Sequence, residues 1–183
     1  MNIFILSKQP EESARLLCDK HISKMVVESA QMLSTAHRML DGNPIKIPGK
    51  RGSYYLHPDS TLDALLYKAV HVHHPCTKWT MVSNNNYTWH YAYFIAMCNE
   101  YTFRYGRVHK THALLGDVLR TPPRNIEIGP KTQFVLAMNS NPECMFPEDP
   151  VKSYRMFYQT KQDRFKMVWT KRDVPEWFTL KSE

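Results

Sequence analysis

The sequence predicts an all-α fold, a compact single-domain helical bundle that spans residues 1–183. Apolar residues recur at helical spacing over two long segments, at about residues 11–39 and 76–105. No alternating pattern typical of a strand extends beyond Ile3 to Leu6, and the chain has no internal repeat. A hydrophobic content of 43% over 183 residues is enough to form a core without a second domain.

The expected helices are bounded by prolines and glycines. The first begins after Pro10 and ends before Gly42, and the 76–105 run ends at Gly106, a typical helix terminator. Between 121 and 149, five prolines and only short apolar runs indicate an ordered connection on the surface. In chain order, the helices are expected at about residues 11–39, 60–70, 76–105, 107–120 and 150–168.

Residues 42–60 interrupt this helical pattern. The segment contains three of the six glycines, together with Pro44, Pro48, Pro58, Lys46, Lys50 and Arg51. Such a composition is typical of a surface connection, so we expect a mobile, positively charged loop here.

The charge balance favours a polyanionic partner. There are 24 Lys and Arg against 17 Asp and Glu, a net charge of +7, and the isoelectric point is near 9.2. Nucleic acid fits this balance better than an acidic ligand of fixed shape. The four cysteines form no CxxC pair and the first residues predict no signal peptide or membrane span, so we expect a cytoplasmic protein that does not bind membranes.

Several common site types are missing from the sequence. It has no Gly-rich phosphate loop, GxSxG, dinucleotide-binding fingerprint or HExxH motif, which argues against the common nucleotide hydrolases, dinucleotide enzymes and zinc peptidases. His71, His73 and His74 lack a second Cys/His pair at zinc-finger spacing. We therefore expect no metal site and no cofactor.

One face of the first long helix carries the residue types of an acid/base centre. His21, Lys24, Glu28 and Gln31 follow one another at steps of three and four, so they lie on one side of the helix. An amine beside a carboxylate could form a Schiff base and move protons. The alternative is that this is the solvated side of an amphipathic helix, whose apolar side contains Leu16, Ile22, Met25, Val26, Ala30, Leu33 and Ala36.

The C-terminal region alternates cations with aromatic residues. Cations can bind phosphates while rings stack on bases, but the rings could equally face inward and anchor the segment. Glu100 and Arg104, near the end of the 76–105 helix, could likewise line a cleft or form a surface ion pair. The cations are Lys152, Arg155, Lys161, Arg164, Lys166, Lys171 and Arg172, and the rings are Tyr154, Phe157, Tyr158, Phe165, Trp169 and Trp177.

The order of these motifs resembles the phage pyrimidine-dimer DNA glycosylase/AP lyase family called endonuclease V, and its short bacterial relatives. The likeness is carried by Asp19-Lys20-His21 with Lys24, Glu28 and Gln31, by His74-Pro75 followed by Trp79, by Arg104 before Gly106, and by Tyr154-Arg155-Met156-Phe157-Tyr158. It covers most of the chain discontinuously, with 42–60 as an extra segment. It implies a helical fold of that type, a bacterial or phage-infected cell as the setting, and double-stranded DNA, damaged or modified, as the partner.

The resemblance also implies a mechanism. An amine attacks C1′ of a distorted nucleotide to form an imine, and Glu28 stabilises the sugar cation and moves the proton for β-elimination. In the family the nucleophile is an N-terminal α-amine, a group whose reference pKa of about 7.7–8.0 leaves a neutral fraction near pH 7. In the family this amine is exposed when Met is removed next to a small residue, whereas here Asn2 follows Met1 and we expect the methionine to be retained. Lys24 is the alternative nucleophile within the helix.

Two groups of residues are thus expected to act. The catalytic group is Glu28, Lys24, His21, Met1 and Asn2, and the DNA-binding group is Lys20, Lys50, Arg51, Arg104, Tyr154, Arg155, Tyr158, Lys161, Arg164, Trp169, Lys171 and Arg172. Two alternatives stay open. The chain could be a DNA-binding protein without catalysis, in which Glu28 only pairs with Lys24, or a phage-type transferase that modifies a base or nucleotide.

Overall fold

The computed structural model describes residues 1–49 and 52–181 and confirms the all-α class. The α-helices are α1 (Pro10–Arg15), α2 (Asp19–Leu40), α3 (Ser60–Leu65), α4 (Pro75–Val82), α5 (Asn84–Tyr105), α6 (Lys110–Leu115) and α7 (Pro150–Gln159). Short 3-10 helices cover Val118–Arg120, Pro142–Cys144 and Thr160–Asp163. The strands β1 (Asn43–Ile45) and β2 (Tyr54–Leu56) form one small sheet. No helix in these two ranges is both long and apolar enough to cross a membrane.

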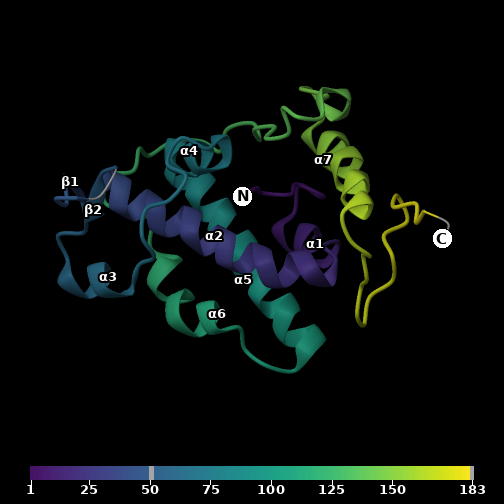
Figure 1. The fold of residues 1–183 in the computed structure, drawn as a ribbon, viewed down its shortest axis with the longest axis horizontal. Coiled ribbons are helices and arrows are strands. Elements are labelled where there is room, and N and C mark those ends of the chain that lie inside the picture. The colour runs from purple at the N-terminus through teal and green to yellow at the C-terminus, as the bar shows by residue number, and fades with distance from the viewer. Residues whose placement is uncertain (50–51, 182–183) are drawn as a thin grey trace.

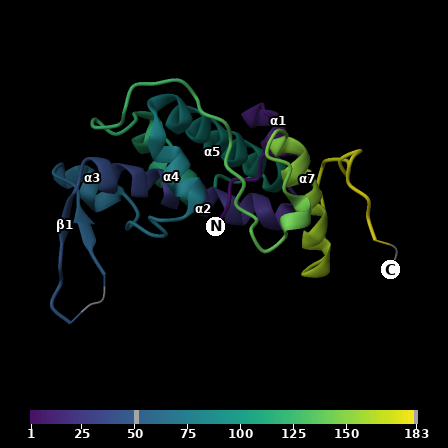
Figure 2. The same ribbon diagram turned by 90° about the horizontal axis from the view of Figure 1, so that it is seen from above.

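The two long helices α2 and α5 pack against each other and organise the fold, with α1 against α5 and α4 against both (Figure 1). Helix α7 lies at one end of the molecule and the β-hairpin at the other, and both views agree on this (Figures 1 and 2). Between them the N-terminal segment runs through the interior, where Ile5 and Leu6 are almost fully buried. The chain therefore begins inside the fold, next to α2.

Two expected helices are each divided in two. The predicted 11–39 helix is interrupted before Cys18, whose extended backbone precedes α2 and whose N–H donates to the Tyr158 hydroxyl. The predicted 76–105 helix is interrupted at Ser83, which is extended and caps α5 by accepting a hydrogen bond from Asn86 N–H. The helical spacing of apolar residues continues across both breaks. The sequence therefore predicts one helix where hydrogen bonds at Cys18 and Ser83 separate two.

The remaining helices are shorter than expected. Helix α3 ends at Leu65, α6 covers only Lys110–Leu115, and α7 ends at Gln159 and continues as a 3-10 turn. The 121–149 connection contains no α-helix or strand, as predicted, and its Phe134 packs against Trp79 and Trp89 of the aromatic core.

The 42–60 segment was expected to be a loop, and this is wrong in part because β1 and β2 pair antiparallel within it. Gly42 is required where α2 meets the hairpin, since a Cβ there would lie 2.9 Å from the Leu56 carbonyl oxygen. The buried Arg38 donates to the carbonyls of Tyr55 and Tyr67 and to Asp63, and thereby ties the hairpin and α3 to α2. Each strand has only three residues, too few to give an alternating pattern in the sequence. The mobility expected for this segment stays a prediction.

Candidate active site

The N-terminus is anchored by Asn2. Its side-chain amide donates to the Ala137 carbonyl at 3.0 Å, and its Oδ1 lies 3.1 Å from the hydroxyl of the buried Tyr154. The Cys76 thiol approaches the same oxygen at 3.5 Å. These contacts reach α4, α7 and the 121–149 connection, so the position of the preceding α-amine is set by three separate parts of the fold.

That α-amine meets the carboxylate of Glu28. The Met1 nitrogen lies 3.5 Å from Glu28 Oε2, and Lys24 Nζ lies 3.3 Å from Oε1. The Met1 side chain is 3% exposed and the Glu28 side chain 14%, against 61% for Lys24. One carboxylate thus faces two amines, one on the half-buried Met1 and one on an exposed side chain.

His21 lies one turn before Lys24 and is held in a fixed orientation. Its Nδ1 is 2.8 Å from the Tyr158 hydroxyl, which already accepts the Cys18 N–H. The one hydroxyl proton is therefore placed to go to Nδ1, which leaves the proton of the neutral ring on Nε2. Burial, followed by the charges of Lys24 and Lys161, lowers the pKa of His21 to about 3. The ring is neutral near pH 7 and presents its Nε2–H as a hydrogen-bond donor.

These groups line an open cavity of about 490 Å³ between the start of α2, the N-terminus and the end of α7. Four cations border it: Lys20, Lys24, Lys161 and Arg164. With a single carboxylate, Glu28, and a neutral His21 among them, the cavity suits an anionic ligand better than a metal cation. Its aromatic walls are Phe4, Phe157 and Phe165.

Lys161 is the most buried of the lysines that border the cavity. It is 8% exposed, and its Nζ lies 3.4 Å from the centre of the Phe157 ring. Burial, together with the nearby Arg164 charge, lowers the pKa of Lys161 to about 8. A neutral fraction of this side chain is therefore present near pH 8, which the sequence did not indicate.

A different carboxylate anchors the C-terminal tail. Glu100 accepts hydrogen bonds from Arg104 at 2.8 Å and from Arg172 at 2.9 Å through both of its oxygens. Arg104 also bonds Asp19 at 2.9 Å, and Thr170 donates to the same carboxylate. Although burial raises the pKa of Glu100, the hydrogen bonds from Arg172 and Arg104 lower it overall. The expected ion pair is present but buried rather than on the surface, and Glu100 also lines a small cavity beside α5 together with Arg172.

The aromatic residues expected to stack on DNA are buried. Tyr154 and Tyr158 are inaccessible, and Trp169 is 6% exposed with its indole N–H donating to the Leu16 carbonyl. Arg155 donates to the Leu6 carbonyl and lies over the Trp177 ring. Of the two interpretations of the C-terminal pattern, inward-facing rings are the one that the packing favours.

The expected DNA-binding cations are dispersed. Lys20, Lys161 and Arg164 border the cavity with Lys24, whereas Lys171 donates to the Phe103 carbonyl and Arg172 bonds Glu100. Lys50 and Arg51 lie outside the described residues. Sequence reasoning missed Ala137 and Ser140 at the cavity rim, since nothing in a proline-rich connection indicates that it returns to the N-terminus.

Comparison with known families gives one match. Residues 1–114, more than half of the chain, match the family model described as pyrimidine dimer DNA glycosylase. The matched region includes Met1, Asn2, His21, Lys24 and Glu28, whereas Lys161 and Arg164 lie beyond it. No curated protein and no solved structure matched the chain.

Proposed function

The chain belongs to the pyrimidine dimer DNA glycosylase family, and on this premise we propose that it excises a damaged pyrimidine from double-stranded DNA and cleaves the strand there. The Met1 α-amine acts as nucleophile and Glu28 as the catalytic carboxylate. The single observation that carries this proposal is the 3.5 Å contact between the Met1 nitrogen and Glu28 Oε2 in a cavity bordered by cations.

The proposed reaction begins when the neutral amine attacks C1′ of the damaged nucleotide. The bond from C1′ to the base breaks, the base leaves with the bonding electrons, and loss of the amine proton and opening of the sugar give an imine. Removal of a proton from C2′ then expels the 3′ phosphate by β-elimination. The carboxylate of Glu28 stabilises the positive charge that develops on the sugar and accepts the proton.

Four amines border the cavity, those of Met1, Lys20, Lys24 and Lys161, and their positions favour Met1 as nucleophile. Lys20 and Lys24 are exposed side chains. Lys161 Nζ lies over the Phe157 ring and forms no ion pair with Glu28. Met1 alone among the four combines contact to Glu28 with a position fixed by the neighbouring Asn2.

The DNA backbone is proposed to lie across the cavity mouth. Lys20, Lys24, Lys161 and Arg164 surround it and can neutralise successive phosphates. The hairpin and the lower end of α7 extend past the N-terminus on the same side of the molecule (Figure 2). A duplex on this side would reach the predicted mobile hairpin, which carries the exposed Lys46.

The test is a cleavage assay on a duplex that contains one cyclobutane pyrimidine dimer or one abasic site, with an undamaged duplex as control. We expect strand scission at the lesion and a covalent adduct when borohydride is present, because borohydride reduces an imine to a stable amine. Binding of the damaged duplex without scission or adduct would contradict the proposal and leave a binding role, in which Glu28 only pairs with the amines.

A further inference from the structure

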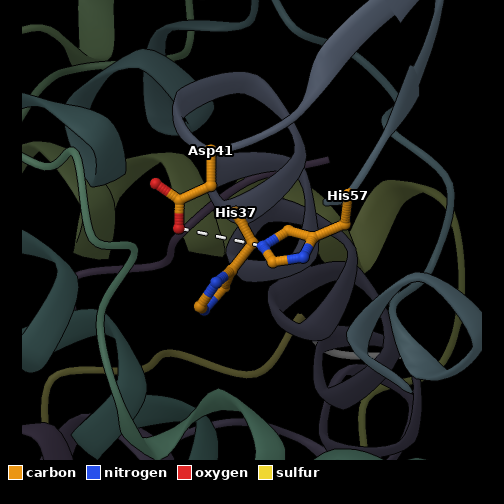
Figure 3. A group of neighbouring side chains, drawn as sticks. All are labelled: His37, Asp41 and His57. Atoms are coloured by element: carbon orange, nitrogen blue, oxygen red, sulfur yellow. Dashed lines mark ion pairs between the residues drawn. The ribbon is translucent and has the colours of Figure 1, made fainter. Parts of the chain in front are cut away.

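A second polar cluster lies at the other end of α2. His37 in the last turn of α2 and Asp41 directly after it face His57, which follows β2. One nitrogen or oxygen atom from each lies within 4.8 Å of the other two, and Figure 3 shows the Asp41 carboxylate and the His57 ring directed toward each other beside His37. His37 is nine residues beyond Glu28, about 14 Å along the helix axis, so this cluster is distinct from the proposed catalytic cavity.

Two histidine nitrogens in the cluster are buried without a hydrogen-bond partner among the described residues. They are His37 Nδ1 and His57 Nε2, in residues that are 3% and 8% exposed. The Tyr87 hydroxyl donates its proton to the Leu119 carbonyl at 2.9 Å, so His37 Nε2 must donate to Tyr87, at 2.9 Å. The neutral His37 ring then has its lone pair on Nδ1.

The Asp41 carboxylate is oriented from outside the cluster. Its two oxygens accept the backbone N–H groups of Arg124 at 2.8 Å and Asn125 at 2.9 Å, and 5% of its side chain is exposed. Asp41 Oδ2 lies 3.8 Å from His57 Nε2, too far for a hydrogen bond. Each carboxylate oxygen therefore keeps a lone pair that can face a ligand between the three side chains.

We propose that His37 Nδ1, His57 Nε2 and a carboxylate oxygen of Asp41 bind one divalent transition-metal ion of the zinc type. Two imidazoles and a carboxylate are a common ligand set for such ions, with a fourth position for water. Ligand atoms of a tetrahedral zinc ion lie about 3.3 Å apart, so modest side-chain rotations from the observed spacing close the site. The hydrogen bonds that Tyr87, Arg124 and Asn125 make to the ligands supply the outer contacts that orient metal ligands.

Binding requires one rearrangement. His57 Nδ1 accepts the Asp59 N–H at 3.1 Å, which places the ring proton on Nε2. Ligation through Nε2 moves this proton to Nδ1, and the amide of the exposed Asp59 turns to water. The ion would connect the end of α2 to the base of the hairpin and, through Asp41, to the segment at Arg124.

The test is metal binding by the full chain after chelator treatment, measured by calorimetric titration with Zn²⁺ and by the absorption spectrum with Co²⁺. We expect one equivalent to bind, a higher Tm with Zn²⁺, and a tetrahedral Co²⁺ spectrum without thiolate charge-transfer bands. His57→Gln and Asp41→Asn should each weaken binding at least tenfold. His73→Gln, in the exposed histidine group, is the matched control and should bind as wild type does.

Two results would overturn the proposal. The first is that the wild-type protein binds no stoichiometric Zn²⁺ or Co²⁺, which would make the cluster a site for buried water. The second is that His73→Gln abolishes binding or that thiolate bands appear, which would place the ion elsewhere. If His57→Gln fails to fold by circular dichroism, Asp41→Asn and the wild-type Co²⁺ spectrum decide the question.

Discussion

Glu28 and Glu100 each contact two cations, yet the two glutamates differ in their exposure and in the lengths of those contacts. Glu100 is 4% exposed and receives three hydrogen bonds of 2.8–2.9 Å from the guanidinium groups of Arg104 and Arg172. Glu28 is 14% exposed, and its two amine contacts are longer, at 3.3 and 3.5 Å. The planar, multiple contacts at Glu100 fix the fold, whereas the longer contacts at Glu28 suit the catalytic role that we propose for it.

The largest effect that separates the two glutamates is expected on catalysis. Glu28→Gln should lower the rate of strand scission on the order of 10²–10⁴-fold, because an amide cannot accept the proton. Binding to the damaged duplex should change little. Single-turnover cleavage measures the first quantity and fluorescence anisotropy the second, with the exposed Glu127→Gln as control. Scission by Glu28→Gln at the rate of the control would remove the carboxylate from the mechanism.

The second effect is on stability, where we expect the substitution of Glu100 to cost more than that of Glu28. Glu100→Gln leaves the buried Arg104 with one charged partner fewer and should lower the free energy of unfolding by about 3–5 kcal/mol. Glu28→Gln should lower it by about 1 kcal/mol or less, since Lys24 is mostly solvated. Urea unfolding of both variants gives these values. Equal losses would mean that both glutamates are structural.

The sequence was most informative along α2. Its three- and four-residue steps correctly place His21, Lys24 and Glu28 on one face, and the resemblance indicated the family that the match over residues 1–114 supports. Helical spacing could not place the Met1 amine beside Glu28, because that contact depends on Asn2 meeting Ala137 and Tyr154.

The burial of the rings that were expected to stack on DNA also has a physical explanation. Tyr154, Tyr158 and Trp169 carry polar atoms that find internal partners, so composition alone could not distinguish a stacking surface from an anchored segment. The spacing of His37 and Asp41 by four residues was visible in the sequence, but His57 joins them only through the hairpin.

Acid should weaken the fold before it titrates the carboxylates. Burial lowers the pKa of His21 to about 3, from an ordinary value of 6.5. The unfolded chain therefore binds a proton that the folded chain excludes, and the free energy of unfolding falls as pH decreases from about 6.5 toward 3. The lowered pKa of Glu100 adds a further loss as the pH falls below the ordinary value of 4.5. Unfolding measured between pH 7 and 4 should show a smaller decline in His21→Gln, and an unchanged decline would contradict this origin.

The smallest expected effect concerns DNA binding. Arg164 borders the cavity and is exposed, so Arg164→Ala should reduce the slope of log K against log salt by about 0.9, the value of one phosphate contact. Arg120→Ala is the control, since Arg120 is exposed and paired with Asp117 away from the cavity. Binding titrations at four or more salt concentrations give the slopes. Identical slopes for both variants would place the duplex elsewhere.

The most direct measurement of the central claim is borohydride trapping on damaged duplex DNA, followed by protease digestion and mass spectrometry of the adduct. We expect the DNA remnant to be attached to the N-terminal peptide at the Met1 α-amine, and Lys24→Ala to form the adduct as well. An adduct at Lys24 or Lys161, or no adduct from protein that cleaves the strand, would contradict the claim that the Met1 α-amine is the nucleophile.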